Sequence, residues 1–167
     1  MPPIEPPDTH FLSAAIGWIE LGNFAEAKSE LKSISPGAAR NPDVLEVWWL
    51  VHAAEEDWVA GLKVARALIE TDPARASGWL HRAYALRRVG GGGLQAAWDA
   101  LLPAVEKFPK EPVIAYNLSC YACQMHRLHD AWQWLKTALK VGGKEKVKAM
   151  ALRDADLEPL WVDIEKL

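Results

Sequence analysis

The sequence has few cysteines, no long apolar run and no large excess of charge of either sign. Its two cysteines, Cys120 and Cys123, are too few for the disulfide framework of a small secreted protein, so we expect a cytoplasmic location. Charged residues interrupt every hydrophobic segment before the roughly 18 to 20 apolar residues of a membrane helix, which predicts a soluble protein. With 19 basic and 22 acidic side chains the net charge is only −3, so neither nucleic acid nor a membrane is an expected partner.

Signals for export are also missing at the amino terminus. The first eight residues, MPPIEPPD, lack the positive start and the apolar stretch of a secretory signal. Because four of them are prolines and little in the segment can be buried, we expect residues 1–8 to form a flexible, proline-rich leader.

Helix-forming and apolar residues are what the sequence has in quantity. Half of the residues are hydrophobic and a quarter are charged, the balance of a globular chain with a single core. Apolar residues recur every three or four positions, with almost no strict alternation. Short breaks rich in Gly, Pro, Asn and Asp divide the chain into about eight helices of roughly 11 to 16 residues. The sequence therefore predicts an all-α fold of helical hairpins.

A repeated pattern of small and apolar residues runs through these predicted helices. A small residue is followed four positions later by one apolar residue, and three positions after that by another. The four sets are Ala27, Leu31 and Ile34; Gly61, Ala65 and Leu68; Ala97, Leu101 and Ala104; and Ala131, Leu135 and Ala138. Their first members lie 34, 36 and 34 residues apart. Since a small residue lets two helices approach closely, this period predicts a stack of similar helix pairs.

The period and the residue types resemble those of the tetratricopeptide repeat (TPR) family. The family's opening aromatic position falls on Phe11, Trp48, Trp79 and, less well, Ala115. Its closing proline falls on Pro42, Pro73 and Pro109, with Gly143 in its place after the fourth repeat. The resemblance implies a small stand-alone, bacterial-type TPR protein. Its fold would be a right-handed superhelix, an α-solenoid, of about four helix hairpins with a C-terminal capping helix.

The resemblance also divides the chain into parts. After the leader at 1–8, repeats are expected at about 9–42, 43–75, 76–111 and 112–143, followed by a C-terminal capping segment at 144–167. Within the last part, RDADLEPLW resembles the closing stretch of many bacterial TPR proteins. Two inner turns differ in length from those of the family. We expect the turn at 55–57 to have about three residues fewer than usual, and the turn at 90–93 to have about two residues more.

In the TPR family the first helices line a concave groove that takes segments of partner proteins. Transferring the groove positions by register selects Trp49, Leu80, His81, Tyr84, Arg87, Arg88, Tyr116, Asn117, Cys120 and Gln124. The first repeat adds Leu12, Ile16 and Ile19. Rigid aromatic rings at Trp49 and Tyr84, with Arg87 or Arg88 to pair a carboxylate, are the predicted anchors. The alternative is that Trp49 packs under a neighbouring helix and that the arginines are solvated.

Thiol and imidazole side chains are concentrated in one short stretch. Cys120, Cys123, His126 and His129 are of the residue types that bind zinc. Each step of three residues drifts by about 60° around a helix, so four such residues converge only if the helix ends early. We predict packing and turn roles for them, with no metal and no cofactor. A metal-binding protein that uses these four residues is the alternative from another functional class.

The sequence assembles no nucleophile, base and orienting group, so no catalytic residue is assigned and no enzyme is predicted. The glycine run at 90–93 lacks the Lys-Ser or Lys-Thr of a phosphate loop, and Asp154 and Asp156 fit helix caps and solvated turns. The predicted function is that of a cytoplasmic adaptor or scaffold that binds another protein or a peptide segment. A secretion-type chaperone or co-chaperone is the first alternative. Self-association stays open, because surplus aromatic surface can be buried between copies.

Overall fold

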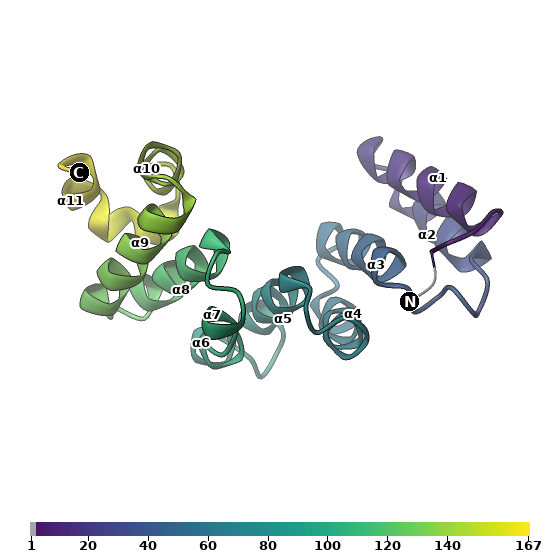
Figure 1. The fold of residues 1–167 in the computed structure, drawn as a ribbon, viewed down its shortest axis with the longest axis horizontal. Coiled ribbons are helices and arrows are strands. Elements are labelled where there is room, and N and C mark those ends of the chain that lie inside the picture. The colour runs from purple at the N-terminus through teal and green to yellow at the C-terminus, as the bar shows by residue number, and fades with distance from the viewer. Residues whose placement is uncertain (1–2) are drawn as a thin grey trace. The chain divides into compact units, whose positions relative to one another are not determined.

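The computed structural model describes residues 3–167, and this part of the chain is helical apart from its turns, with no strand (Figure 1). The predicted all-α class is therefore confirmed. The chain divides into two compact units, Met1–Ala85 and Leu86–Leu167, with the boundary inside one helix. Among the described residues, no helix combines the length and apolar character required to span a bilayer.

Unit 1 consists of two helix hairpins followed by most of a fifth helix. The hairpins are α1 (Asp8–Glu20) with α2 (Phe24–Ser33) and α3 (Pro42–Ala54) with α4 (Trp58–Thr71), and α5 (Ala76–Arg88) follows. The second helices begin at side-chain caps: the Asn23 and Asp57 side-chain oxygens accept hydrogen bonds from backbone N–H groups. These caps fix where each hairpin turns back.

Unit 2 contains the end of α5 and the rest of the chain. Its elements are α6 (Leu94–Leu101), α7 (Ala104–Lys107), α8 (Pro112–Gln124), α9 (Leu128–Gly142), α10 (Lys144–Ala151), the 3₁₀ helix η1 (Ala155–Leu160) and α11 (Trp161–Glu165). Pro103 separates α6 from α7, because proline has no N–H to continue the helical hydrogen bonds. Helix α10 packs on α9, as a cap would, whereas η1 turns back and packs on α8.

The core follows the repeated pattern of the sequence. All members of the four sets are buried, and Ala27, Ala97 and Ala131 are completely inaccessible, with Gly61 at the equivalent place in α4. In unit 1, residues of the first set join Val44, Val47 and Val51 in one cluster. Burying each large apolar side chain contributes roughly 1.5 to 3 kcal/mol, so the pattern marks the residues that hold the pairs together.

Three of the inner turns share one form. The turns at 21–23, 55–57 and 125–127 each have a middle residue with positive φ: 73° at Gly22, 57° at Glu56 and 59° at His126. The prediction of a short turn in the second repeat is therefore wrong, because its turn is as long as the other two. The inner turn of the third repeat runs from 89 to 93 and is two residues longer, as predicted.

The longer turn is closed by its own backbone. The Gly93 N–H donates to the carbonyl oxygen of Leu86 at 2.8 Å. Gly92 passes so close to this oxygen that a Cβ there would lie 2.0 Å from it, and Gly93 itself has a φ of 117°. The glycine run is thus a specified turn between α5 and α6.

The amino-terminal segment contacts the core of unit 1. Residues 1 and 2 of the predicted leader lie outside the described part, whereas Ile4 packs against the core cluster. The Asp8 carboxylate, at the start of α1, accepts hydrogen bonds from the Ser35 hydroxyl at 2.5 Å and the Ser35 N–H at 2.9 Å. These two hydrogen bonds lower the pKa of Asp8. They tie the start of α1 to the turn that follows α2.

Candidate functional site

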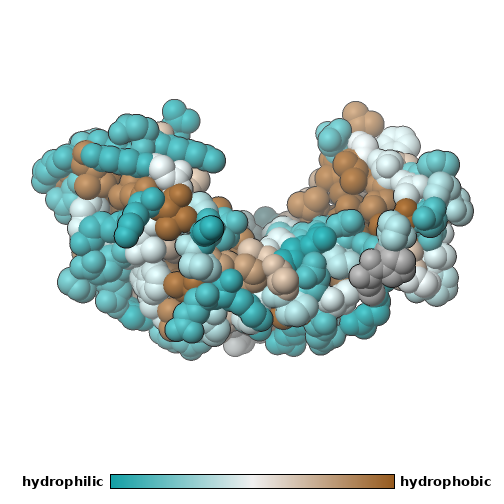
Figure 2. Space-filling view, in the orientation of Figure 1, coloured by the Kyte–Doolittle hydropathy of each residue, from teal (hydrophilic) through white to brown (hydrophobic). Residues whose placement is uncertain are grey.

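The first helices of unit 1 carry a surface of apolar and aromatic side chains. We call it the first-helix face, and it comprises Leu12, Ile16, Ile19, Trp49, Leu50, Leu80, His81 and Tyr84. Residues three and four apart lie on one side of a helix, which places these side chains along α1, α3 and α5. Ile16 is 42% exposed, Leu50 45% and Tyr84 37%. Figure 2 shows apolar residues gathered over α1 and α3.

Trp49 supports this face from beneath. Its indole is only 9% exposed and stacks on the His81 ring, with centroids 3.7 Å apart and an interplanar angle of 11°. The Tyr84 ring meets Trp49 edge-on at 6.0 Å and Trp58 at 5.7 Å. The prediction of Trp49 as an exposed anchor is corrected by this burial, because a neighbouring helix covers the ring. Tyr84 is the aromatic residue that reaches the surface.

A carboxylate fixes the orientation of His81. Glu46 on α3 binds two residues of α5. Its Oε2 lies 2.6 Å from the His81 Nε2, and its other carboxylate oxygen accepts a hydrogen bond from the Ser77 hydroxyl. Burial alone raises the pKa of Glu46, but these hydrogen bonds and the charges of His81 and Arg75 outweigh it and hold the pKa below its ordinary value. The ionised carboxylate therefore joins α3 to α5 under the exposed aromatic side chain.

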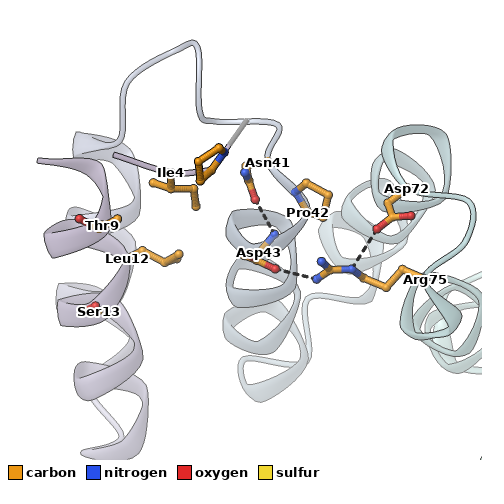
Figure 3. Close-up of a pocket in the computed structure, with 10 residues that line it drawn as sticks. Ile4, Thr9, Leu12, Ser13, Asn41, Pro42, Asp43, Asp72 and Arg75 are labelled. Atoms are coloured by element: carbon orange, nitrogen blue, oxygen red, sulfur yellow. Dashed lines mark hydrogen bonds and ion pairs between the residues drawn. The ribbon is translucent and has the colours of Figure 1, made fainter. Parts of the chain in front are cut away.

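A pocket of about 460 Å³ lies where α1 meets the start of α3 (Figure 3). Leu12 points into it from α1, and Asp43 and Arg75 form its polar side. The Arg75 guanidinium is engaged on both sides, 2.8 Å from Asp43 and 3.3 Å from Asp72. The cation of the pocket is thus paired with its carboxylates, and Leu12 lies on the apolar side.

The equivalent side of α8 in unit 2 is occupied by the chain itself. We call residues 154–160 the tail segment. The Tyr116 hydroxyl donates to the Asp154 carboxylate at 2.8 Å, and the Cys120 thiol lies 3.6 Å from the same oxygen. Arg87 binds the Asp156 carboxylate through two nitrogens, one at 2.8 Å, and the Gln124 amide donates to the Asp156 carbonyl oxygen at 3.0 Å. Four residues of the predicted groove are thus brought together around an internal segment.

Burial of the Cys120 thiol and the Tyr116 hydroxyl, and the pairing of Arg87 with Asp156, keep these groups protonated. The pKa of the Cys120 thiol is raised by burial first and by the charges of Asp154 and Asp156 next. The pKa of Tyr116 is raised by burial and by its hydrogen bond to Asp154. The Asp156 hydrogen bond raises the pKa of Arg87 further. At neutral pH the site consists of protonated donors that face two carboxylates.

The structure separates the four residues of the alternative metal site by burial. Cys120 and Cys123 are buried in α8, whereas His126 and His129 are exposed beyond its end. Among the described residues, the only cluster of three potential ligands is Cys120, Asp154 and Asp156, whose ligand atoms lie within 4.8 Å of one another. Arg87 forms an ion pair with Asp156 and the Tyr116 hydroxyl donates a hydrogen bond to Asp154, so both carboxylates are engaged by protein side chains.

The remaining predicted groove residues are Arg88, which is exposed at the end of α5, and Asn117, which is half-buried on α8. Leu80, also half-buried, belongs to the first-helix face. Sequence reasoning missed Glu46 as a site residue and assigned Asp154 and Asp156 to caps and solvated turns. Asp154 does cap η1, but both carboxylates also bind side chains of the predicted groove. The only signal was position: Glu46 falls one helical turn before Trp49 on the same side of α3.

Solved structures with the same arrangement of helices settle the fold. One is TTC0263, described as a thermophilic TPR protein in Thermus thermophilus, with a TM-score of 0.73 at 15% identity over 94% of this chain and 82% of that one. This chain has a TPR-type fold. MamA is similar too, with a TM-score of 0.68 at 16% identity over 91% of this chain and 90% of MamA. No known family matches the sequence, and neither does any curated protein.

The helix order can be compared with the predicted repeats. Helices α1, α3, α5 and α8 begin at or just before the starts of the four predicted repeats, and α1, α3 and α8 each pack against the helix that follows. The positions at which the TPR pattern expects aromatic residues hold Phe11, Trp48 and Trp79, all half-buried, and Ala115, which is buried. Phe11 and Trp48 pack against the core cluster of unit 1, so the positions of the TPR pattern serve packing there.

Proposed function

We propose that this chain is a non-enzymatic protein-interaction module that binds an apolar segment of another protein on the first-helix face. One observation carries the proposal. Ile16, Leu50 and Tyr84 stand on three successive first helices, and each is more than a third exposed. Large apolar side chains exposed together on a folded protein are typical of interaction surfaces.

The exposed aromatic residue is held rigidly, which favours binding. Trp49 and Trp58 both contact the Tyr84 ring, and the hydrogen bond that His81 donates to the Glu46 carboxylate keeps His81 stacked on Trp49. A ring that is already ordered loses little conformational entropy when a partner packs against it. Tyr84 is therefore the residue we propose as the main anchor, with Ile16 and Leu50 as the apolar contacts beside it.

The fold supports the same class of function by analogy. The TPR family, which the sequence resembles, uses its first helices to bind segments of other proteins, and the proposed face lies on those helices. An adaptor and a chaperone both fit this face. They differ in the partner, which an adaptor binds in its folded state and a chaperone in an unfolded one.

Side-chain chemistry argues against nucleophilic catalysis at the cysteines. Both thiols are buried, and burial raises the pKa of each, so neither is a thiolate at neutral pH. A nucleophilic cysteine needs a lowered pKa and access to its substrate. The thiols of α8 serve packing and, at Cys120, the contact with Asp154.

The test is affinity capture with matched variants of the full chain. One variant carries Ile16→Ser, Leu50→Ser and Tyr84→Ser. The control carries Val59→Ser, Leu102→Ser and Val162→Ser, three comparably exposed positions away from the face. Because surface substitutions usually change stability by less than about 0.5 kcal/mol each, both variants should fold. Circular dichroism checks this.

We expect wild type and control to retain the same protein, and the face variant to bind it at least about tenfold more weakly, which is about 1.4 kcal/mol. Equal retention by all three chains would place the interface elsewhere and would refute the proposed face. Capture of the protein only when it is unfolded would identify a chaperone.

A further inference from the structure

The tail segment contacts α8 in the way that a bound peptide contacts its receptor. Two carboxylates two residues apart, Asp154 and Asp156, meet different donors, and the backbone carbonyl of Asp156 accepts a further hydrogen bond from Gln124. Leu157 follows directly and is completely buried. Carboxylates for orientation, one main-chain contact and one apolar anchor are the usual elements of peptide recognition.

The receptor side is a single stripe of donors. Tyr116, Cys120 and Gln124 succeed each other every four residues on α8, so they lie on one side of that helix. Arg87 adds a two-nitrogen contact to Asp156, and its guanidinium also lies 5.8 Å from the centre of the Tyr121 ring. Such a two-point contact selects a carboxylate by geometry as well as by charge.

A segment that only covered the apolar surface of the last helix pair would not need the carboxylates of Asp154 and Asp156. The 3₁₀ helix η1 packs on α8 and α9, and its apolar residues Leu157 and Leu160 are buried. Bringing carboxylates out of water costs free energy unless partners replace the lost hydration, so apolar residues would cover the repeat more simply. The paired charges therefore point to recognition in addition to covering.

The tail segment is also the kind of element that opens locally. It consists of Asp154 and the six-residue 3₁₀ helix η1, which has a proline inside it, and 3₁₀ helices have poorer hydrogen-bond geometry than α-helices. Arg153, just before it, and Glu158 and Pro159, within it, are exposed. Elements of this kind open at lower free energies than the core of a domain.

We propose that the tail segment is an internal ligand. It occupies a carboxylate-binding site, formed by Arg87, Tyr116, Cys120 and Gln124, that takes an acidic segment of a partner protein with two carboxylates two residues apart and a leucine next. While the tail segment is bound, the site is closed, so the apparent association constant for the partner is the intrinsic constant multiplied by the fraction of molecules in which the site is open. This site does not depend on the first-helix face of unit 1.

The test uses the full chain and a peptide of known sequence. The probe is a fluorescein-labelled synthetic peptide of residues 152–163, LRDADLEPLWVD, and the measurement is fluorescence polarisation. In the receptor, Asp154→Asn with Asp156→Asn weakens the tail segment's contacts and leaves the donors on α8 and α5 unchanged. The matched control is Asp163→Asn, whose carboxylate contacts only the exposed Lys166 in a described ion pair.

We expect the double variant to bind the peptide at least tenfold more tightly than wild type or the Asp163→Asn control. Adding Arg87→Gln to the double variant should remove most of that gain, and a peptide with asparagine at both aspartate positions should not bind. Amide hydrogen exchange of residues 154–160 should be at least tenfold faster in the double variant, with α8 still protected.

Three results would overturn the proposal. Unchanged exchange of residues 154–160 in the double variant would show that the carboxylates do not hold the segment. Faster exchange without peptide binding would show that the site has no affinity for an acidic segment in trans. A wild-type dimer that dissociates on Arg87→Gln substitution would identify the tail segment of a second copy as the occupant in place of a different partner.

Discussion

The two units use the same side of their first helices differently. In unit 1 this side carries exposed Ile16, Leu50 and Tyr84 over a buried aromatic stack, whereas in unit 2 Tyr116 and its neighbours on α8 hold the tail segment. Ile16 and Tyr84 in unit 1 and Cys120 in unit 2 occupy the same position of the predicted TPR register. The repeat thus determines which side of a helix is available, and the side chains at a few positions determine whether it remains open.

The chemistry of the two surfaces differs accordingly. Unit 1 offers rings and aliphatic side chains, which stabilise a partner by burial of apolar surface. Unit 2 offers a hydroxyl, an amide and a guanidinium, which are satisfied by carboxylates and a carbonyl group. The comparison predicts that unit 2 depends on its occupant for stability, and that unit 1 does not depend on a partner in this way.

The strongest test of this difference is Leu157→Ala. Leu157 in the tail segment is completely buried, and removing a buried leucine side chain costs about 2 to 5 kcal/mol. We expect a loss of that size in the free energy of unfolding, measured by urea denaturation. Val162→Ala, at a position 66% exposed, is the control and should change it by less than about 0.5 kcal/mol. A loss below about 1 kcal/mol for Leu157→Ala would contradict the dependence of unit 2 on its tail segment.

A smaller effect is expected from Glu46→Gln, which weakens the support beneath the face of unit 1. The pKa of Glu46 in the folded protein lies below its ordinary value of 4.5. Its contribution is therefore fully present above pH 4.5 and is lost as the pH falls through the folded-state pKa. We expect Glu46→Gln to lower the free energy of unfolding by about 1 kcal/mol at pH 7 and the difference from wild type to shrink below pH 4.5.

The control for this experiment is Glu70→Gln, which removes an exposed ion pair with Arg40. Pairs of that kind contribute little, so a change below about 0.5 kcal/mol is expected at pH 7. A difference for Glu46→Gln that stays constant from pH 7 to about pH 3 would show that the loss has another origin than the ionised carboxylate.

The smallest change in the free energy of unfolding is expected for Gly61→Ala. Gly61 stands in unit 1 at the place in the repeated pattern that Ala97 and Ala131 hold in unit 2. A Cβ at Gly61 would meet its nearest atoms at 3.8 Å, an ordinary contact distance. Gly61→Ala should therefore raise the free energy of unfolding by about 0.5 to 1 kcal/mol, because glycine lowers helix stability. Thermal denaturation followed by circular dichroism measures this.

Gly78 provides the opposite case in α5. A Cβ there would lie 3.1 Å from the side chain of Ile69 and 3.3 Å from its backbone nitrogen, so α4 would have to shift. Gly78→Ala should destabilise the chain while Gly61→Ala stabilises it. The same sign for both substitutions would mean that helix propensity, and not packing, controls these positions.

Periodicity was enough to predict much of the fold. The four sets of small and apolar residues are all buried. Local spacing was sufficient here because it determines which residues share the side of a helix that faces its neighbour. The length of the turn at 55–57 was misjudged, because family patterns do not show that Glu56 adopts the same left-handed conformation as Gly22.

The sites were less predictable, because their key contacts join distant residues. His81 and Glu46 are 35 residues apart, and Arg87 and Asp156 are 69 apart, so neither pair follows from helix periodicity. Register placed Arg87 correctly on the binding side of its helix. It did not reveal that a carboxylate of the same chain already binds the guanidinium, since that depends on how the tail segment turns back.

The glycine run between α5 and α6 bears on how freely this gene can vary. At Gly92 any side chain would collide with the Leu86 carbonyl oxygen, and at Gly93 the backbone adopts a conformation that other residues rarely adopt. Gly90, in contrast, has open space around it and an ordinary backbone conformation. Homologous sequences that keep this turn should therefore vary at Gly90 and retain glycine at Gly92 and Gly93. The four glycines look alike in the sequence, but substitutions at them should not be tolerated equally.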